Sequence, residues 1–99
     1  MALTFPSVTT TFSAPLDRWD ELFVTLSAWR ATVTEFPGCQ SVYVYASADG
    51  AVVDGQIVVN WDTVPERDTW LAVGYTAGSL FGELQPPVSS ATRSVERIF

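Results

Sequence analysis

A hairpin signal in the middle of the chain constrains the fold most, because a helix stop, a strand, a turn and a second strand follow one another directly. Pro37-Gly38 ends the preceding segment, and residues 39–48 then carry apolar or amphipathic side chains on both faces. Asp-Gly pairs at 49–50 and at 54–55 are both hairpin turn signals, and the pattern leaves open which one closes the hairpin. The return strand covers residues 57–61, so the hairpin forms the centre of a small α+β domain.

The segment before the hairpin predicts a strand and then a helix. Residues 7–12 are mostly β-branched or aromatic, which favours a strand. Ser13 is expected to cap the helix and Pro15 to lie in its first turn. Apolar residues then recur at three- and four-residue spacing, which predicts one apolar face of a helix of about five turns. These residues are Leu16, Trp19, Leu22, Phe23, Leu26, Trp29 and Val33.

The segment after the hairpin predicts a short helix, a second helical turn and a last strand. Thr63 and Glu66 have the spacing of a capping box. Residues 76–84 restart a turn or helix, which Pro86-Pro87 prevents from continuing. Residues 90–99 alternate and read as a strand. One side of this strand carries Arg93, Val95, Arg97 and Phe99.

The resulting order is βαββαβ. With right-handed crossovers it predicts a ferredoxin-like α+β fold, in which a four-stranded antiparallel sheet carries both helices on one face. The other face of the sheet is expected to be largely apolar or aromatic. A second copy should therefore cover that face, which predicts a homodimer in the form of a dimeric α+β barrel.

The length of the chain predicts one domain over residues 1–99, and its composition predicts that a partner or a ligand covers part of its aromatic surface. The chain has four Trp, three Tyr and six Phe, more aromatic area than a small monomer easily buries, so a partner subunit or a ligand pocket is expected to use some of it. The net charge is −6 and the five arginines are scattered, which argues against nucleic acid and anionic membranes as partners. A single cysteine, Cys39, fits a reducing compartment.

Two further absences from the sequence favour a cytoplasmic protein. The first six residues show neither the basic nor the apolar part of a signal peptide. No apolar run approaches the ~20 residues that a membrane-spanning helix needs.

The available side chains exclude several kinds of chemistry. The chain has no His, so a Ser-His-Asp or Cys-His relay cannot be built, and transition-metal sites lack the His or Cys clusters they need. No glycine-rich phosphate-binding motif is present, so no cofactor and no metal is expected. Carboxylates, Tyr hydroxyls, Arg, the Asn60 amide and indole N–H groups remain. These groups suit cofactor-independent oxygenation of a deprotonated substrate, and they suit an aldol-type cyclisation equally well.

Each candidate site residue also has a purely structural interpretation. Alternation places Trp61 on the same strand face as Val59 and Ile57, where it either packs the core or walls a pocket between sheet and helices. Trp70 and Tyr75 either line that pocket or pack nearby. The remaining candidates are expected nearer the barrel or on the last strand: Tyr43 and Tyr45 at the barrel or its mouth, and Arg93 and Arg97 either holding an anionic oxygen or as solvated edge charges. Cys39 is expected to be a structural thiol.

An ordered set of motifs resembles a known family. Pro37-Gly38 follows an amphipathic segment, a strand, an Asp-Gly turn and a strand ending in Trp61 come next, and a short helix then carries Trp70-Leu71-Ala72. This set is similar to the antibiotic biosynthesis monooxygenase family over most of the chain. The resemblance implies a dimeric α+β barrel and one of several activities: oxidation of aromatic polyketide phenols to quinones with O₂ and no cofactor, haem degradation, or cyclisation. Residues 41–50 look most like the quinone-forming branch.

Departures from the family pattern narrow these activities. Many members carry a His nine residues after the Trp that matches Trp61, where this chain has Trp70. Haem-degrading members share a Trp there and need a His ligand ten residues later, where this chain has Leu80, so haem ligation by His is excluded. The quinone-forming branch uses polar and basic side chains on the helix after Trp61, and Phe81 stands in the place of one of its arginines.

The first hypothesis is therefore a cofactor-free monooxygenase that oxidises an aromatic polyketide-type phenol or anthrone to a quinone in secondary metabolism. A polyketide cyclase or isomerase on the same scaffold and a non-catalytic dimeric ligand-binding module are the alternatives. A pocket beside Trp61, Trp70 and Tyr75 would favour an enzyme, and a closed interior would favour the binding module. The predicted catalytic residues are Trp61, Trp70 and Arg93, and the predicted substrate-binding residues are Tyr43, Tyr45, Asn60, Tyr75 and Phe81.

Overall fold

A computed structural model describes residues 5–98 of the chain. Predictions that concern residues 1–4 and Phe99 lie outside this range. The strands and helices, in chain order, are β1 (Phe5–Pro15), the 3₁₀ helix η1 (Leu16–Arg18), α1 (Trp19–Val33), β2 (Cys39–Asp49), β3 (Val52–Trp61), α2 (Val64–Val73), α3 (Ala77–Glu83) and β4 (Ser89–Arg97).

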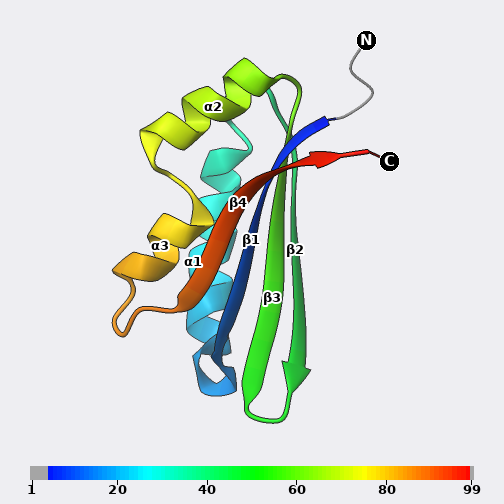
Figure 1. Ribbon diagram of the computed structural model, residues 1–99. Helices are drawn as coiled ribbons and strands as arrows, with labels where there is room; N and C mark the ends of the chain where they lie inside the picture. Colours follow the sequence, from blue (N-terminus) through cyan, green and yellow to red (C-terminus); the bar gives the residue numbers. More distant parts are fainter. Residues whose placement is uncertain (1–4, 99) are drawn as a thin grey trace.

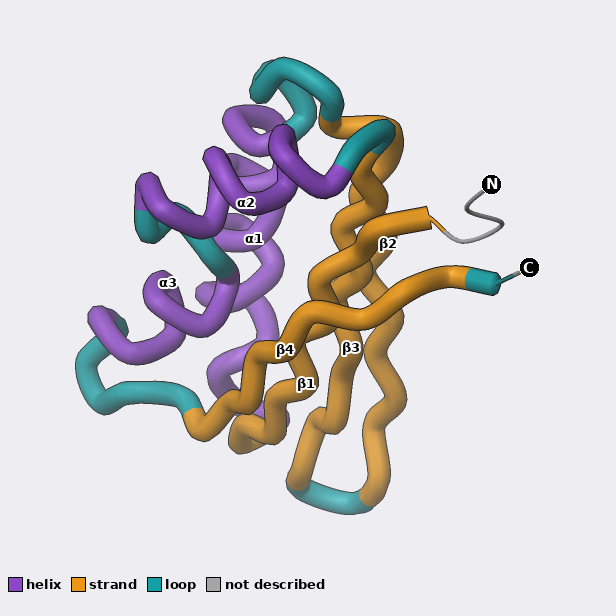
Figure 2. The backbone as a smooth tube through the Cα atoms, turned by 45° about the horizontal axis from the view of Figure 1, so that its top comes forward, coloured by secondary structure: helices purple, strands orange, loops and turns teal. Residues whose placement is uncertain are grey.

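The four strands form one antiparallel sheet in the order β2-β3-β1-β4. All three α-helices lie on the same face of this sheet, as Figures 1 and 2 show. This arrangement is the ferredoxin-like α+β fold, so the fold predicted from the order of elements is confirmed. The sheet has a helix-covered face and an opposite face, which we call the open face.

The turn at Asp49-Gly50 closes the β2–β3 hairpin, which settles the choice that the sequence left open. Gly50 has a φ of 62°, a left-handed value that glycine adopts without steric strain. The second Asp-Gly pair lies inside β3, where Gly55 is paired with Phe12 of β1 and Ala46 of β2. The return strand therefore begins at Val52, earlier than predicted.

The first strand is longer than predicted, and it replaces the expected helix cap at Ser13. β1 is a central strand, and Ser13 is paired with Asp54 of β3 and with Ser89 of β4. Pairing on both sides keeps the backbone extended up to Pro15, which then caps η1 without a side-chain hydrogen bond. The α-helix begins only at Trp19.

The predicted apolar face of the first helix is only partly buried. Leu22, Leu26, Trp29 and Val33 are buried against the sheet. Leu16 and Phe23, however, are 41% and 59% exposed, so their assignment to one common apolar face was wrong. Phe23 follows Leu22 directly and therefore points about 100° away from it around the helix axis. Its ring instead lies 6.2 Å from that of Trp19 on the outside of the helix.

The two short helices begin with side-chain caps. The Thr63 hydroxyl oxygen accepts a hydrogen bond from the Glu66 N–H at 3.3 Å, as the capping-box prediction requires, and the Thr63 O–H donates to the Glu66 carboxylate at 2.8 Å. α2 then ends at Gly74, which has a φ of 80°. Thr76 caps α3 in the same way by accepting from the Ser79 N–H at 3.1 Å.

The open face is mainly polar, so the expectation of a largely apolar or aromatic face was wrong. The strand register places Ser7, Thr9, Thr11 and Ser13 on this face from β1, Gln56, Val58 and Asn60 from β3, Ser41, Tyr43 and Tyr45 from β2, and Ala91, Arg93, Val95 and Arg97 from β4. Most apolar residues of the same strands, among them Val8, Phe12, Ile57 and Val59, point to the helices and form the core. A single chain therefore hides most of its apolar sheet surface without a partner.

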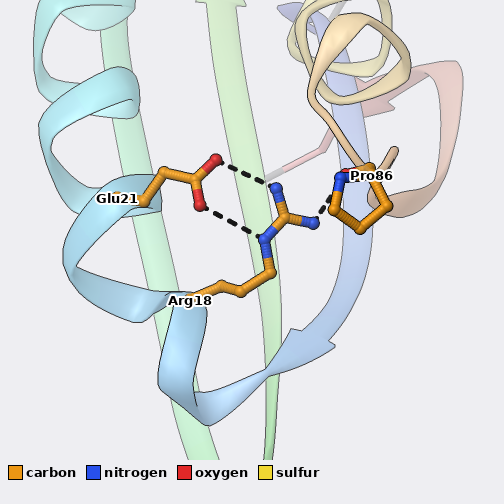
Figure 3. Close-up of polar contacts among 3 residues, drawn as sticks. All are labelled: Arg18, Glu21 and Pro86. Atoms are coloured by element: carbon orange, nitrogen blue, oxygen red, sulfur yellow. Dashed lines mark hydrogen bonds and ion pairs between the residues drawn. The ribbon is translucent and has the colours of Figure 1, made fainter.

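Arg18 connects the start of α1 to the loop that follows α3 (Figure 3). Its Nε and Nη2 atoms donate to the two carboxylate oxygens of Glu21 at 3.2 and 2.9 Å. Its Nη1 donates to the Pro86 carbonyl oxygen at 2.6 Å. One side chain thus joins two segments that are far apart in the sequence, in the forked geometry that arginine favours with carboxylates.

This contact predicts a pH dependence of stability. The hydrogen bond from Arg18 lowers the pKa of Glu21 below its ordinary value. Because the pKa is lower in the folded state, the stabilisation is fully present above the ordinary glutamate pKa and is lost as the pH falls through the lowered value. Glu21→Gln should therefore lower the melting temperature at neutral pH, and the difference from the unmodified protein should disappear in acid. Glu83→Gln serves as the control, and a difference of constant size at every pH would contradict the prediction.

Candidate functional site

The structure divides the predicted site residues between the two faces of the sheet. Trp61, Trp70 and Phe81 lie on the helix-covered side and are buried. Tyr43, Tyr45 and Asn60 lie on the open face. Arg93 pairs with Thr9 and also lies on the open face. The sheet separates Arg93 from Trp61 and Trp70. The three predicted catalytic residues therefore do not form one site.

Trp61 and Trp70 form the centre of the helix-side cluster. Trp61 ends β3 and Trp70 comes from α2, and their ring centroids are 5.1 Å apart at an interplanar angle of 36°. Their indole Nε1 atoms are buried and have no hydrogen-bond partner among the described residues. Trp29, by contrast, donates its indole N–H to the Tyr75 carbonyl oxygen at 3.0 Å. Two unpartnered donors in one ring pair are therefore a specific feature of this cluster.

An unpartnered N–H inside a protein is unfavourable by about 1–3 kcal/mol, and such groups usually meet an acceptor, a bound water or a ligand. The oxygen of a phenolate is an acceptor of the right kind. The ring centroids of Phe81 and Phe12 are 4.9 Å apart. Phe81 is itself fully buried, so side chains fill the space around it. In the conformation described, an aromatic substrate would reach the tryptophan pair only if the helices moved.

Tyr75 lies in the connection between α2 and α3. Its ring stacks on that of Phe36 at a centroid distance of 6.3 Å rather than on Trp61 or Trp70. Its carbonyl oxygen accepts the Trp29 hydrogen bond described above, so the backbone of this residue joins the connection to α1. The structure thus gives Tyr75 a packing role beside the helices.

The open face contains a hydrogen-bonded row that crosses three strands. The Ser7 hydroxyl donates to Asn60 Oδ1 at 2.6 Å, and Asn60 Nδ2 donates to Ser41 Oγ at 3.0 Å. Ser7 and Asn60 are both buried, although they face away from the helices. Tyr43 and Tyr45 are 50% and 58% exposed beside this row, with their rings 6.4 Å apart.

Sequence reasoning named Asn60 but missed Ser7 and Ser41. Alternation alone could have placed Ser7 on the face opposite Val8. Ser41 lies on the same face as Tyr43 and Tyr45 by alternation, so the pattern could have placed it too once the Asp49-Gly50 turn was chosen to close the hairpin. Cys39 itself lies at the start of β2, where burial raises the pKa of its thiol. This supports the prediction that Cys39 is a structural thiol, because the reactive form is the thiolate.

Comparison with known proteins identifies the fold. A putative antibiotic biosynthesis monooxygenase from Deinococcus radiodurans is similar to this chain with a TM-score of 0.71 and 17% identity, over 91% of this chain and 89% of that one. A putative antibiotic biosynthesis monooxygenase from Bacillus cereus gives a TM-score of 0.64 and 10% identity, over 94% and 92%. A Bacteroides thetaiotaomicron protein of unknown function, described as a possible oxidoreductase, gives 0.71 and 12%, over 96% and 99%.

The chain thus has the fold of these three proteins over almost its whole length, in agreement with the resemblance seen in the sequence. No protein-family model matches the sequence, and no curated protein is significantly similar to it. Within residues 5–98, no helix is long and apolar enough to cross a membrane.

Proposed function

We propose that this protein is a cofactor-independent monooxygenase that oxidises an aromatic phenol or anthrone of the polyketide type to a quinone. The unpartnered indole N–H groups of Trp61 and Trp70 carry the proposal, because they are buried donors in an aromatic cluster. The fold supports it, since solved structures with this fold include putative antibiotic biosynthesis monooxygenases.

The chemistry needs only a site that favours the anion of the substrate. An anthrone loses a proton from its central methylene carbon, and the resulting phenolate-type anion transfers one electron to O₂. The two radicals combine to form a carbon–oxygen bond, and the resulting peroxide anion takes back a proton. The hydroperoxide then loses water to leave a carbonyl group. One oxygen atom enters the product and the other leaves as water. Indole N–H groups that donate to the phenolate oxygen would stabilise the anion in a site that excludes water.

The proposal predicts that the protein accelerates O₂ uptake by an anthrone. Trp61→Phe and Trp70→Phe keep an aromatic ring and remove one N–H each. Each should slow the reaction by about 100- to 1,000-fold, the scale expected for one lost donor to a developing anion. Trp19→Phe changes a residue at the outer side of α1 and should have no effect. An oxygen electrode measures all four proteins, and a rate no higher than that of buffer for the unmodified protein would reject the proposal.

The closed interior favours a second candidate, a ligand-binding module without catalysis. Trp61, Trp70 and Phe81 leave the region between sheet and helices filled in the described conformation. This candidate predicts that an anthrone binds, as seen by quenching of tryptophan fluorescence, while the O₂ concentration stays constant. The same two measurements therefore separate the two candidates.

We also propose that two copies pair through the open face. The support is narrower than an apolar sheet. Tyr43 and Tyr45 are exposed large side chains on a mainly polar surface, and tyrosine is enriched at the centres of protein interfaces. Analytical ultracentrifugation at micromolar protein concentration, on the same preparation that is used for O₂ uptake, gives the mass of the protein in solution. A mass equal to one chain would reject the pairing.

A further inference from the structure

The open face carries opposite charges toward its two ends. Strand register places Arg93 and Arg97 of β4 on this face, and Arg97 is level with Phe5, where β1 begins. The acidic residues on the strands of this face, Asp49 and Asp54, lie beside the β2–β3 turn. Figure 1 shows the end of β4 and this turn at opposite ends of the sheet. We call these the arginine end and the aspartate end of the open face.

These charges are not balanced within one copy. Among residues 5–98, none of the four charged groups just named forms an ion pair. The Nε atom of Arg97 is buried without a hydrogen-bond partner in this part of the chain, and its Nη2 donates to Gln40 Oε1 at a long 3.4 Å. Asp54 is level with Ser13, so about 26 Å of strand separates it from Arg97 at 3.3 Å per residue. At that distance the salt of a physiological buffer screens the attraction almost completely.

The open face is large enough to form a specific interface with a second copy. The ladder between β1 and β3 runs from Ser7 to Pro15, which is about 30 Å, and four strands spaced about 4.8 Å apart make the face about 19 Å wide. Two such faces would bury about 1,100 Å² in total, more than the ~1,000 Å² that a biological interface needs. Tyr43 and Tyr45 lie within this area, so it coincides with the surface through which pairing is proposed above.

Two copies can pair through this face with their ends matched or with their ends inverted. A dimer with two-fold symmetry uses the same surface on both copies. A two-fold axis parallel to the strands matches the ends, which brings the aspartates of both copies to one end and the arginines of both copies to the other. Packed sheets lie about 10 Å apart, a separation at which salt screens like charges only partly. An axis perpendicular to the strands inverts one copy and places the arginine end of each copy over the aspartate end of the other.

We propose that the second copy binds in the inverted orientation, so that each copy supplies the carboxylates that the arginines of the other lack. With the two-fold axis close to Thr10 of β1, Arg93 comes level with the partner's Asp54. Arg97 then comes level with the partner's Asp49. The two sheets cross at about 30°, as twisted sheets do, in the sense that brings β4 of each copy toward β3 and β2 of its partner.

This contact gives the buried Nε of Arg97 an acceptor, because a guanidinium binds a carboxylate with two N–H donors at once. The inverted orientation presupposes the pairing proposed above and adds to it which ends of the two sheets meet. It does not depend on the proposed oxygenase activity, because Trp61 and Trp70 lie on the other side of the sheet.

The distance between two spin labels, one on each copy, tests the orientation. Ala51→Cys places the label in the β2–β3 turn, and Cys39→Ser removes the native thiol. In the inverted orientation the two turns lie at opposite ends of the dimer, so the labels should be about 35–40 Å apart. The matched orientation would bring both turns to the same end with the labels at about 15–20 Å, and this result would overturn the proposal. Pulsed electron–electron double resonance measures distances over this range.

Exchange of the charges tests the contact between the copies. Arg93 and Asp54 are both exposed, so their substitution leaves the core intact. Arg93→Glu and Asp54→Arg each place like charges against one another and should weaken the dimer at least about 10-fold. The protein with both substitutions has opposite charges across the interface again, so its dissociation constant should return to within about 3-fold of that of the unmodified protein. Glu83→Arg makes the same charge change on the helix-covered side and should alter the dissociation constant by less than about 2-fold.

Analytical ultracentrifugation measures these dissociation constants and separates the possible failures. A double variant that is weaker than either single variant would overturn the inverted orientation and leave the pairing itself intact. Single variants that dimerise as well as the unmodified protein would do the same. A mass of one chain for the unmodified protein would reject both the pairing and its orientation, whereas the O₂ measurement alone decides the oxygenase.

Discussion

Replacement of Trp29 by alanine is expected to remove about 3–5 kcal/mol from the free energy of unfolding. Trp29 is almost fully buried in α1, and its indole N–H donates to the Tyr75 carbonyl oxygen. The substitution therefore leaves a large cavity and also removes the hydrogen bond that joins α1 to the α2–α3 connection. For a domain of this size, the melting temperature should fall by roughly 15–30 °C. Thermal unfolding followed by circular dichroism measures this change.

Trp19 provides the matched control. It is half-buried at the start of α1, and its ring contacts the exposed Phe23. Trp19→Ala should lower the free energy of unfolding by only about 1–2 kcal/mol, because little surface leaves the core. Equal destabilisation by the two substitutions would mean that Trp29 does not hold the central position that the structure gives it.

The second large effect is expected from Gly55→Ala. A Cβ atom at Gly55 would overlap the ring of Phe12, its partner on β1, and would lie 2.8 Å from the Tyr45 carbonyl oxygen. Phe12 is buried and packs on Phe81, so its ring has little room to move. The substitution should cost about 2–3 kcal/mol, at the upper end for overpacked sites. Urea unfolding of the variant measures the loss.

Two further substitutions test the origin of this cost. Gly82→Ala makes the same change in the exposed part of α3, where a Cβ atom meets nothing within 4 Å, and it should stabilise the protein by about 0.5–1 kcal/mol. Phe12→Leu replaces the ring that the new methyl group would meet with a smaller side chain. Added to Phe12→Leu, the Gly55 substitution should therefore cost less than it does alone. Strict additivity of the two free-energy changes would show that the Phe12 contact is not the cause.

The sequence was informative wherever one local pattern decides the outcome. Alternation along β3 placed Ile57, Val59 and Trp61 on one face, and the register confirms that they point to the helices. The cap of α2 followed from the spacing of Thr63 and Glu66. Local signals such as these were enough to obtain the order of elements and thereby the fold.

Relations between strands were harder to predict. Alternation groups residues within β4, but it does not say that Arg93 faces away from Trp61, because that depends on the pairing of β4 with β1. The polar character of the open face was missed for a related reason. Which face an apolar strand residue occupies depends on the pairing between strands, and most of these residues belong to the helix-covered side. The unpartnered N–H groups of Trp61 and Trp70 depend on packing details that no sequence pattern contains.

The irregular pairing at the start of β2 has a consequence for the two side chains that flank it. Cys39 is opposite Trp61 but Ser41 is opposite Asn60, so Gln40 is an additional residue in the ladder. The Asp49-Gly50 turn sets the pairing of residues 41–49 with β3, so the additional residue changes only what precedes Ser41. Strict alternation would place Cys39 on the same face as Ser41. The additional residue instead lets Cys39 pack against the core opposite Trp61, while Ser41 joins the hydrogen-bonded row on the open face.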